Sequence, residues 1–440
     1  MNVFFVSLGC DKNLVDSEHM LSMLQQHGYD ICDDESIADA IVINSCCFIK
    51  DAMEESIDTI IEMGKYKTEG RCKALILCGC LAQRFAEEIP VELPEVDGII
   101  GTNSYDALIA VLDEVFAGHK TTVVKELSGL PKNEGRLISA GGYSAYLKIA
   151  EGCDKHCSYC IIPKIRGDFR SVPMEELLEE AQVLAASGVK ELVLVAQEVT
   201  VYGSDLYGKK TLPTLLEKLS EIEGIQWIRL LYCYPEEITP ELIEVMATNP
   251  KICHYIDMPI QHISNRILGR MGRRTSQQDI YDIIAALRAR IPDITLRTTL
   301  ICGFPGETEE DHQELMAFIK TAAFDRLGAF TYSQEDGTVA ANFPDQVEDV
   351  IKDMWYNDVM TAQQEITFAK NDTLIGQTME VLIEGRMSGE DVYVGRTYRD
   401  APSVDGYVFV HSPREFMSGD FVSVTITAAK DYDLIGDVAE

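Results

Sequence analysis

The sequence has no apolar run of the roughly 18 residues that a helix needs to cross a bilayer. Its opening residues, MNVFFVSLGC, place a cysteine after an apolar run, as a lipoprotein signal does. They lack the basic segment that begins such a signal, and the apolar run is very short. We therefore expect these residues to form a buried strand of a cytoplasmic protein that has no membrane partner.

Positive charge is also scarce. The 440 residues include 38 Lys and Arg against 72 Asp and Glu, which gives a formal net charge of −34. A protein with this charge repels the phosphates of nucleic acids and attracts basic partners. We therefore do not expect a nucleic acid as the direct substrate, although the same charge would also keep an ordinary enzyme dispersed in solution.

Cysteine, by contrast, is abundant. A cytoplasmic chain keeps its thiols reduced, so 13 cysteines indicate metal or redox chemistry rather than disulfides. Isolated cysteines usually act as small buried hydrophobic residues. Five positions fit that interpretation: Cys32, Cys72, Cys233, Cys253 and Cys302. The others fall into two groups.

The order of the apolar segments predicts three domains. Over residues 1–130, four apolar runs alternate with amphipathic, helix-like segments, which indicates an N-terminal parallel α/β domain. The predicted strands are 2–8, 38–44, 73–78 and 96–101. A loop region rich in Gly, Lys and Pro follows at 127–136 and 139–142.

Over residues 140–370 the alternation resumes with six strand patterns, which are too few for a closed eight-stranded barrel but suit a partial (β/α)6 barrel. They lie at 144–150, 190–196, 227–232, 255–260, 294–301 and 326–332. After a helix over 353–372, short alternating segments predict a small all-β barrel over 371–440. The fold class is therefore α/β, and ligands should bind at the carboxyl ends of the parallel strands.

The first cysteine group follows strands of the N-terminal domain. Cys10, Cys46 and Cys80 each end a predicted strand, with spacings of 36 and 34 residues. The carboxyl ends of parallel strands meet at one edge of a sheet, so three thiols should gather there as ligands. The alternative is three core cysteines that happen to end strands. Cys78 lies within an apolar run, which makes Cys80 the better ligand, but spacing does not choose between Cys46 and Cys47.

The second cysteine group lies in the stretch EGCDKHCSYC. Cys153, Cys157 and Cys160 are separated by three residues and then two. A zinc site usually has four ligands in pairs, and no fourth cysteine stands nearby. A C-x3-C-x2-C loop can instead hold three corners of an iron–sulfur cube and leave one iron open.

This stretch resembles the radical S-adenosylmethionine superfamily, in which C-x3-C-x-aromatic-C follows the first barrel strand. The resemblance implies that the open iron binds S-adenosylmethionine and that Tyr159 lies near its adenine. ICGFPGET, at 301–308, resembles the glycine-rich segment of the superfamily. This second likeness implies that Gly303, Pro305 and Gly306 pass close to the adenosine.

The resemblance extends over nearly the whole chain to the methylthiotransferases of this superfamily. SLGCDKNLVDSE, INSCCFIKDAMEES and CGCLAQR resemble their N-terminal domain, and the terminal barrel resembles their TRAM domain, an OB-like fold. The match implies a second four-iron cluster held by Cys10, Cys46 and Cys80. Cys47 stands where the family usually has Gly, so Cys47, like Cys78, remains an alternative ligand.

Two branches of this family compete. One modifies an adenosine of transfer RNA, and the other modifies an aspartate of a small-subunit ribosomal protein. SLGCDKN, IDMPIQHIS, AQEVTVYG and, apart from Ser403, DAPSVDG resemble the second branch. Residues 371–440 contain 13 acidic and 5 basic residues, a net charge of −8. A barrel that binds RNA should be basic, whereas an acidic barrel suits a basic ribosomal protein as substrate.

The β-carbon of aspartate carries an unactivated C–H bond, so its modification needs a radical that only a cofactor can supply. By resemblance, the reduced cluster of the second cysteine group cleaves S-adenosylmethionine, and a 5′-deoxyadenosyl radical takes the hydrogen. The other cluster presents sulfur, which a second S-adenosylmethionine methylates to give a β-methylthio-aspartate. A reducing electron donor, flavodoxin- or ferredoxin-like, is also implied.

Two polar residues are further candidates for cofactor contacts. Gln197, followed by Glu198, ends the second barrel strand, but a cap for the next turn explains these residues equally well. Arg297, on the fifth barrel strand, could hold a cofactor carboxylate, and a structural ion pair is an equal alternative. A different class of function stays open as well: an iron–sulfur electron carrier or scaffold, which would need neither ICGFPGET nor the terminal barrel.

Overall fold

The computed structural model describes residues 1–132, 135–139 and 141–439. The chain forms two compact units, and neither is a single continuous segment. The first contains Met1–Ser139, Ala150–Val172 and Glu335–Thr338, and the second contains Ala140–Ile149, Pro173–Gln334 and Val339–Glu440. Among the described residues, no helix combines the length and the apolar character needed to span a membrane.

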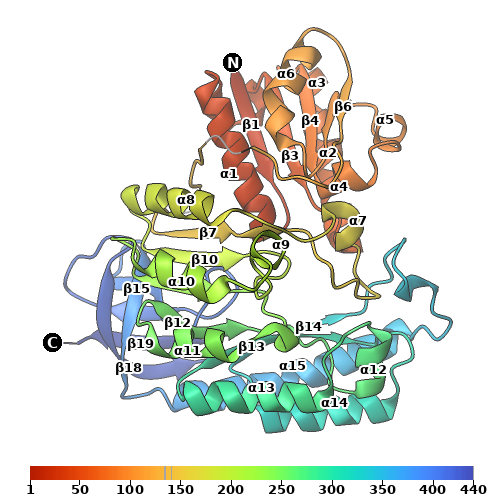
Figure 1. Ribbon diagram of the computed structural model, residues 1–440. Helices are drawn as coiled ribbons and strands as arrows, with labels where there is room; N and C mark the ends of the chain where they lie inside the picture. Colours follow the sequence, from red (N-terminus) through yellow and green to blue (C-terminus); the bar gives the residue numbers. More distant parts are fainter. Residues whose placement is uncertain (133–134, 140, 440) are drawn as a thin grey trace. The chain divides into compact units, whose positions relative to one another are not determined.

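The first unit is built on a six-stranded parallel sheet with the strand order β2-β1-β3-β4-β5-β6 (Figure 1). Its strands are β1 (Asn2–Ser7), β2 (Asp30–Cys32), β3 (Ala40–Ser45), β4 (Ala74–Gly79), β5 (Gly98–Ile100) and β6 (Thr121–Val123). The four predicted strands are confirmed. The sequence pattern missed β2 and β6, because three residues are too few to show a period of two.

Every residue of β3 and β4 is buried, because helices cover both faces of the sheet. Alternate residues enter two separate cores: Ile41 and Leu75 lie in one, Val42 and Ile76 in the other. The helices of this unit are α1 (Asp11–Gln26), α2 (Lys50–Gly64), α3 (Tyr66–Glu69), α4 (Cys80–Arg84), α5 (Ile89–Glu92) and α6 (Leu108–Phe116), with 3-10 turns η1 (Glu35–Ile37) and η2 (Tyr105–Ala107). The predicted loop at 127–136 and 139–142 is irregular where it is described, and residues 133, 134 and 140 lie outside the described residues.

The first unit also includes a segment from the middle of the chain. Residues 150–172 form an antiparallel ribbon of β8 (Ala150–Glu151) and β9 (Arg170–Ser171), with the short helix α7 (Ile162–Arg166) between them. Ile161 and Ile165 enter the same apolar core as Leu81 in α4. The loop that carries the second cysteine group is therefore anchored in the first unit.

The second unit contains a six-stranded parallel sheet in the order β14-β13-β12-β11-β10-β7, so neighbours in space are neighbours in sequence (Figure 1). The strands are β7 (Ser144–Lys148), β10 (Glu191–Val195), β11 (Trp227–Leu230), β12 (Ile252–Asp257), β13 (Thr295–Cys302) and β14 (Arg326–Thr331). This is the predicted partial (β/α)6 barrel, with β7 and β14 at its edges.

Helices follow these strands and cover the outside of the sheet. They are α8 (Met174–Ala186), α9 (Ser204–Tyr207), α10 (Leu212–Ser220), α11 (Pro240–Thr248), α12 (Asn265–Arg270), α13 (Gln277–Arg290), α14 (Glu309–Ala322) and α15 (Asp349–Asp372), with 3-10 turns η3 (Pro235–Glu237) and η4 (Ala340–Asn342). Ser276 and Thr308 begin α13 and α14 with capping boxes, in which Asp279 and Asp311 bind back to the cap residue. These caps satisfy amide groups that the first helical turn leaves unpaired.

A closed five-stranded barrel ends the chain, with the strand order β15-β16-β17-β19-β18. The strands are β15 (Thr378–Arg386), β16 (Val392–Arg396), β17 (Val408–His411), β18 (Phe421–Lys430) and β19 (Asp433–Val438). The small all-β barrel was expected, but its last strand was not identified. β19 reads DLIGDV, and Asp and Gly within it weaken the strand signal.

The terminal barrel is fixed to the parallel sheet by buried ion pairs. Glu191, the first residue of β10, pairs with Arg396 at 2.7 Å and with Arg229 at 2.9 Å. Arg326, the first residue of β14, pairs with Asp400 at 2.6 Å. These residues lie at or near the amino ends of β10, β11 and β14, so the terminal barrel is joined to that end of the sheet.

Candidate functional site

The first cysteine group lies at the carboxyl ends of three adjacent strands of the first unit. Cys10 follows β1 and precedes α1, Cys46 follows β3, and Cys80 begins α4 directly after β4. Gly9 allows the close approach: it has a φ of +88°, and a Cβ placed on it would lie 2.8 Å from the Cβ of Cys46. The structure thus brings these three cysteines to one edge, as the spacing predicted.

The three thiols are close enough to influence one another electrostatically. Burial raises the pKa of Cys46, and a nearby thiolate at Cys10 raises it further. Burial also raises the pKa of Cys80 to about 12, although the Arg166 guanidinium acts in the opposite direction. Both Cys46 and Cys10 add to the shift at Cys80. With these raised pKa values, Cys46 and Cys80 hold their protons in the free protein and would give them up on binding a metal.

Of the two competing cysteines, Cys47 lies within electrostatic range of Cys80 and Cys46, whereas Cys78 shows no such interaction with the described residues. Cys47 is fully buried in the core that contains Ile41 and Leu75, and Arg84 donates a hydrogen bond to its backbone carbonyl. Cys78 is buried in the core on the other face, and burial alone accounts for its raised pKa. Cys78 therefore has the surroundings of an apolar side chain, whereas Cys47 also has Arg84 and the Cys80 thiol nearby.

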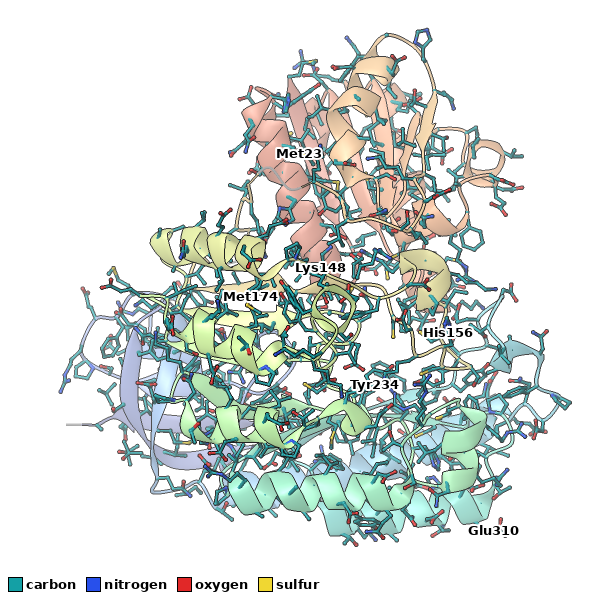
Figure 2. The ribbon with its side chains drawn as sticks, viewed as in Figure 1. Met23, Lys148, His156, Met174, Tyr234 and Glu310 are labelled. Carbon is teal, nitrogen blue, oxygen red and sulfur yellow. The ribbon has the colours of Figure 1, made fainter. Side chains whose placement is uncertain are left out.

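The second cysteine group forms a compact loop between β8 and α7. The Cys153 amide donates to the carbonyl of Gly167 at 3.0 Å, and the Cys160 amide donates to the carbonyl of Cys157 at 3.0 Å. His156, labelled in Figure 2, turns this loop with a φ of +49°. Burial raises the pKa of Cys160 to about 12, and the Cys157 and Cys153 thiols contribute to the shift. These three sulfur atoms therefore lie within electrostatic range of one another.

Both groups fit an iron–sulfur cluster by the chemistry of their donors, since thiolates are the ligands that such clusters use. Within the described ranges, no three Cys, His, Asp or Glu side chains are close enough to chelate one metal ion. A four-iron cube is much larger than one ion, so its ligands stand further apart. Each group offers three sulfur ligands and leaves a fourth corner open.

Sequence reasoning missed Arg166, which lies at the end of α7 and is 2% exposed. Its guanidinium contacts the thiol of Cys80 at 3.6 Å, and it also pairs with Asp16 and Glu151. Asp16 lies 150 residues earlier in the chain, and no local pattern reveals a pair of that kind. A basic residue that ends a short helix, three residues after a proline and two after a lysine, looks like an ordinary surface residue.

In the second unit, the residues of ICGFPGET form a tight turn at the carboxyl end of β13. The carboxylate of Glu307 accepts hydrogen bonds from the amides of Gly303 and Phe304 at 2.7 and 3.0 Å. The Gly306 amide donates to the carbonyl of Asp345 at 2.7 Å, and Arg270 donates to the carbonyl of Pro305 at 3.1 Å. The turn is therefore held by the protein itself.

The polar candidates occupy different surroundings. Arg297 pairs with Asp257 at 2.7 Å and lies 3.6 Å from Asp405, which is the arrangement of a structural ion pair. Glu198 accepts a hydrogen bond from the amide of Thr200 at 3.0 Å and so caps the turn after β10. Gln197 is half-buried at the end of that strand, and Tyr159 is half-buried beside Cys160.

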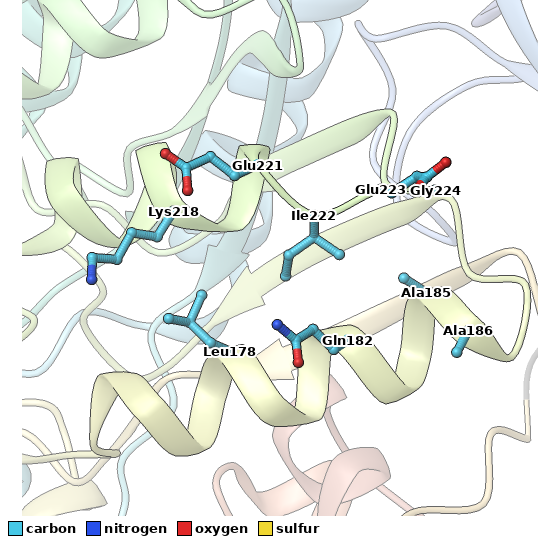
Figure 3. Close-up of a pocket in the computed structure, with 9 residues that line it drawn as sticks. All are labelled: Leu178, Gln182, Ala185, Ala186, Lys218, Glu221, Ile222, Glu223 and Gly224. Atoms are coloured by element: carbon cyan, nitrogen blue, oxygen red, sulfur yellow. The ribbon is translucent and has the colours of Figure 1, made fainter.

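A surface hollow of about 660 Å³ lies elsewhere, between α8 and α10 (Figure 3). It is lined by Leu178 and Gln182 of α8 and by Glu221–Gly224, which lead into the amino end of β11. The hollow contains none of the candidate residues. Barrels of this kind bind their substrates at the carboxyl ends of the strands, so this hollow lies on the wrong side for chemistry.

Three family models match the chain. Residues 147–319 match the radical SAM superfamily, residues 2–101 match uncharacterized protein family UPF0004, and residues 375–439 match the TRAM domain. Among solved structures, the radical S-adenosylmethionine methyltransferase TsrM of Kitasatospora setae matches with a TM-score of 0.55 and 14% identity, over 75% of this chain and 72% of that one. At that identity the likeness shows the fold alone.

Curated relatives align from end to end. The ribosomal protein uS12 methylthiotransferase RimO of Lachnoclostridium phytofermentans is 56% identical, with 99% of each chain covered. The protein of the same name from Pelotomaculum thermopropionicum is 49% identical, and that of Clostridioides difficile is 48% identical, each over at least 99% of both chains. The chain therefore belongs to the RimO family of radical SAM methylthiotransferases.

Proposed function

We propose that this protein methylthiolates ribosomal protein uS12, adding sulfur and a methyl group at the β-carbon of an aspartate. The observation that carries the proposal is the pair of cysteine groups on a chain that aligns from end to end with RimO proteins. One cysteine group would suffice for cleavage of S-adenosylmethionine. A second group with a free corner gives the enzyme a place for the sulfur that it must insert.

In this proposal Cys153, Cys157 and Cys160 hold one four-iron cluster, and Cys10, Cys46 and Cys80 hold the other. When bound, these cofactors supply an electron to cleave S-adenosylmethionine, a radical able to attack an unactivated C–H bond, and an iron that carries sulfur. Cys46 and Cys80 are each 6% exposed, and Cys153 and Cys157 are 6% and 5% exposed. This burial shields two thiols of each group from water, whereas Cys10 is exposed and Cys160 is partly exposed.

The contacts to S-adenosylmethionine are proposed at the carboxyl ends of the strands. They are Tyr159, Gln197, Arg297, Gly303, Pro305 and Gly306. The turn fixed by Glu307 supports the three residues after β13, since a rigid backbone can lie against an adenosine without reorganising. For Arg297 the pairing with Asp257 supports the structural alternative equally well.

The partners follow from the same reasoning. The substrate is a basic ribosomal protein in the cytoplasm, nucleic acid is not the direct substrate, and a flavodoxin- or ferredoxin-like protein supplies the electrons. The domains that we propose are 1–130 for the N-terminal methylthiotransferase domain, 140–370 for the radical SAM domain and 371–440 for the TRAM domain. The three family matches lie within these ranges and support them.

Iron counting tests the division of labour. Protein reconstituted without oxygen should hold about eight irons per chain, as expected for two four-iron clusters. Replacing Cys153, Cys157 and Cys160 with Ala should leave about four irons and abolish cleavage of S-adenosylmethionine. Replacing Cys10, Cys46 and Cys80 should also leave about four irons, but cleavage should continue while methylthiolation of uS12 stops. Loss of cleavage in the second variant, with the fold intact, would contradict the proposal.

Two other functions are outcomes of the same assay. Methylthiolation of transfer-RNA adenosine with uS12 left unmodified would assign the chain to the other branch of the family. A protein that binds about eight irons but never cleaves S-adenosylmethionine would be an electron carrier or a scaffold.

A further inference from the structure

We propose that Arg166 is a positioning residue for the site formed by Cys10, Cys46 and Cys80, where it donates a hydrogen bond to the sulfur of Cys80 and supplies positive charge. The inference rests on the proposed function, because it concerns a cluster held by these cysteines. It adds a residue from outside the N-terminal sheet, since Arg166 comes from the segment that carries the other cysteine group.

The guanidinium of Arg166 is divided between two tasks. Its Nη1 atom donates to Asp16 at 2.9 Å and to Glu151 at 3.0 Å. Its Nη2 atom donates to the side-chain oxygen of Asn13 and faces the Cys80 sulfur at 3.6 Å. The two carboxylates fix the plane of the guanidinium, because its donors form a rigid fork. The second nitrogen is thereby aimed at Cys80.

Asn13 extends this arrangement to the other two cysteines. Its side-chain nitrogen donates to the carbonyl of Leu8 at 3.1 Å and to the carbonyl of Ser45 at 3.0 Å. Leu8 lies two residues before Cys10, and Ser45 lies directly before Cys46. Arg166 therefore supports the backbone before two ligands through Asn13, and it touches the third ligand directly.

The charge has a consequence for the cluster as well as for the fold. A cluster with three thiolate ligands is negatively charged, and hydrogen bonds to its sulfur atoms stabilise the reduced state and raise the reduction potential. Groups that orient and hydrogen-bond metal ligands typically change metal affinity by about 10- to 100-fold. A purely structural ion pair between α7 and α1 would need only the contact to Asp16.

The test uses the full chain with Cys153, Cys157 and Cys160 replaced by Ala, so that only the site at Cys10, Cys46 and Cys80 can be loaded. In this parent, Arg166→Lys keeps the positive charge but cannot reach both carboxylates and the Asn13–Cys80 side at once. We expect the variant to load iron, to lose it to a chelator about 10- to 100-fold more readily, and to show a lower reduction potential. The near-ultraviolet circular dichroism of each variant should be measured as well, to show that its tertiary structure is unchanged.

A second variant is needed because removal of Arg166 alone would leave two buried carboxylates, Asp16 and Glu151, without a positive partner and could unfold the protein. Arg166→Met combined with Asp16→Asn and Glu151→Gln removes one positive and two negative charges. The change in net charge would by itself raise the potential, so a lower potential in this variant would come from the lost hydrogen bond to Cys80, and iron should be lost to a chelator as readily as in Arg166→Lys. Lys164→Arg is the matched control: Lys164 is on the same helix, the change keeps its charge, and its ammonium donates to the carbonyl of Gly337. It should leave the potential unchanged.

The possible failures are distinct. A parent that holds no iron would overturn the proposed function, and the inference with it. A parent that holds about four irons, with the same potential and the same iron retention in both Arg166 variants, would overturn the inference alone. An equal shift in Lys164→Arg would also overturn it, because the effect would then belong to the segment and not to the contact with Cys80.

Discussion

Glu191 of β10 and Arg396 of β16 form an ion pair of 2.7 Å, with both side chains fully buried and 205 residues between them. Arg229 shares the same carboxylate at 2.9 Å. The terminal barrel is thus joined to the parallel sheet by charges that have no access to water. A truncation at residue 371 would leave those charges unpaired and would damage the sheet along with the barrel.

Replacing Arg396 with Met should cost about 3–5 kcal/mol of unfolding free energy, because Glu191 keeps only Arg229 and Glu384 loses its ion pair, which leaves one carboxylate without a compensating charge. Denaturant unfolding measures the loss. Arg386→Met is the control, since Arg386 lies on the barrel surface, 46% exposed, in a pair with Asp391. That change should cost less than about 1 kcal/mol. Similar losses of unfolding free energy in both variants would mean that the buried ion pair stabilises the protein no more than the exposed one.

Acid should weaken the same junction in a defined range. Burial alone would raise the pKa of Glu191, but the guanidinium groups of Arg396 and Arg229 outweigh it and lower the pKa from 4.5 to about 2. A carboxyl group with a lowered pKa stabilises the fold fully above its unfolded value and loses that effect as the pH falls toward the folded value. The difference in unfolding free energy between the unchanged protein and Glu191→Gln should therefore shrink between pH 4.5 and 2. A difference that does not change with pH over this range would contradict the assignment.

Neighbouring cysteines should behave differently. Cys46→Ala should lose one cluster, whereas Cys47→Ala should keep about eight irons and lose only about 1 kcal/mol of stability, because Cys47 fills an apolar core. The same contrast is expected between Cys80 and Cys78. Iron analysis after anaerobic reconstitution decides the matter. Retention of both clusters in Cys46→Ala, with loss in Cys47→Ala, would reverse the ligand assignment.

Gly79 sets the direction in which Cys80 leaves β4. It has a φ of +91°, and a Cβ there would lie 2.3 Å from the side-chain oxygen of Asn44 and 2.6 Å from the carbonyl oxygen of Ser45. Gly79→Ala should therefore cost more than about 2 kcal/mol and reduce the iron content by about half. Gly28→Ala is matched to it, with a φ of +79° but open space around the added carbon. It should cost only about 1–2 kcal/mol and keep all its iron, so a loss of iron in both variants would point to backbone strain alone.

The acidic surface of the terminal barrel should steer the basic substrate. Three of its acidic residues, Glu384, Asp400 and Asp405, are bonded to buried partners and do not contribute to that surface. Glu380 and Asp437 are exposed and lie on either side of β18, opposite Ser423 and Thr425. Changing both to Lys should slow association with uS12 severalfold, with little effect on dissociation.

The control for that surface reverses two charges elsewhere. Glu55→Lys with Asp58→Lys changes the net charge equally but lies on α2 of the first unit. Salt should reduce the difference between the two double variants, because the screening length is about 8 Å at physiological ionic strength. Equal slowing by both pairs would show that net charge acts, and not the barrel surface.

The fold was largely predictable because its strands are apolar runs bounded by turns. β3 and β4 are buried on both faces, so they read as continuous apolar segments, and the six strands of the second unit pair in chain order. The short strands β2 and β6 were not predictable, since a strand of three residues carries no period.

The site was predictable only in part, because some of its residues are brought together by contacts between distant segments of the chain. The cysteines were found because their spacing follows the strands. Arg166 was not found, because its partners Asn13 and Asp16 lie about 150 residues earlier and only the folded chain brings them together. The net charge of the terminal barrel was counted correctly, but the sequence does not reveal which of its carboxylates are buried.

The segment from residue 150 to 172 also fixes an order of events during synthesis. The sheet of the first unit is complete once β6 has been made, at residue 123. Asp16, buried in α1, then still lacks its cation, and the core around Leu81 lacks Ile161 and Ile165. Arg84 waits longer still, since Glu335 is its partner. A nascent chain therefore completes its first sheet early, but the unit around that sheet is complete only after residue 338, when most of the second unit has been translated.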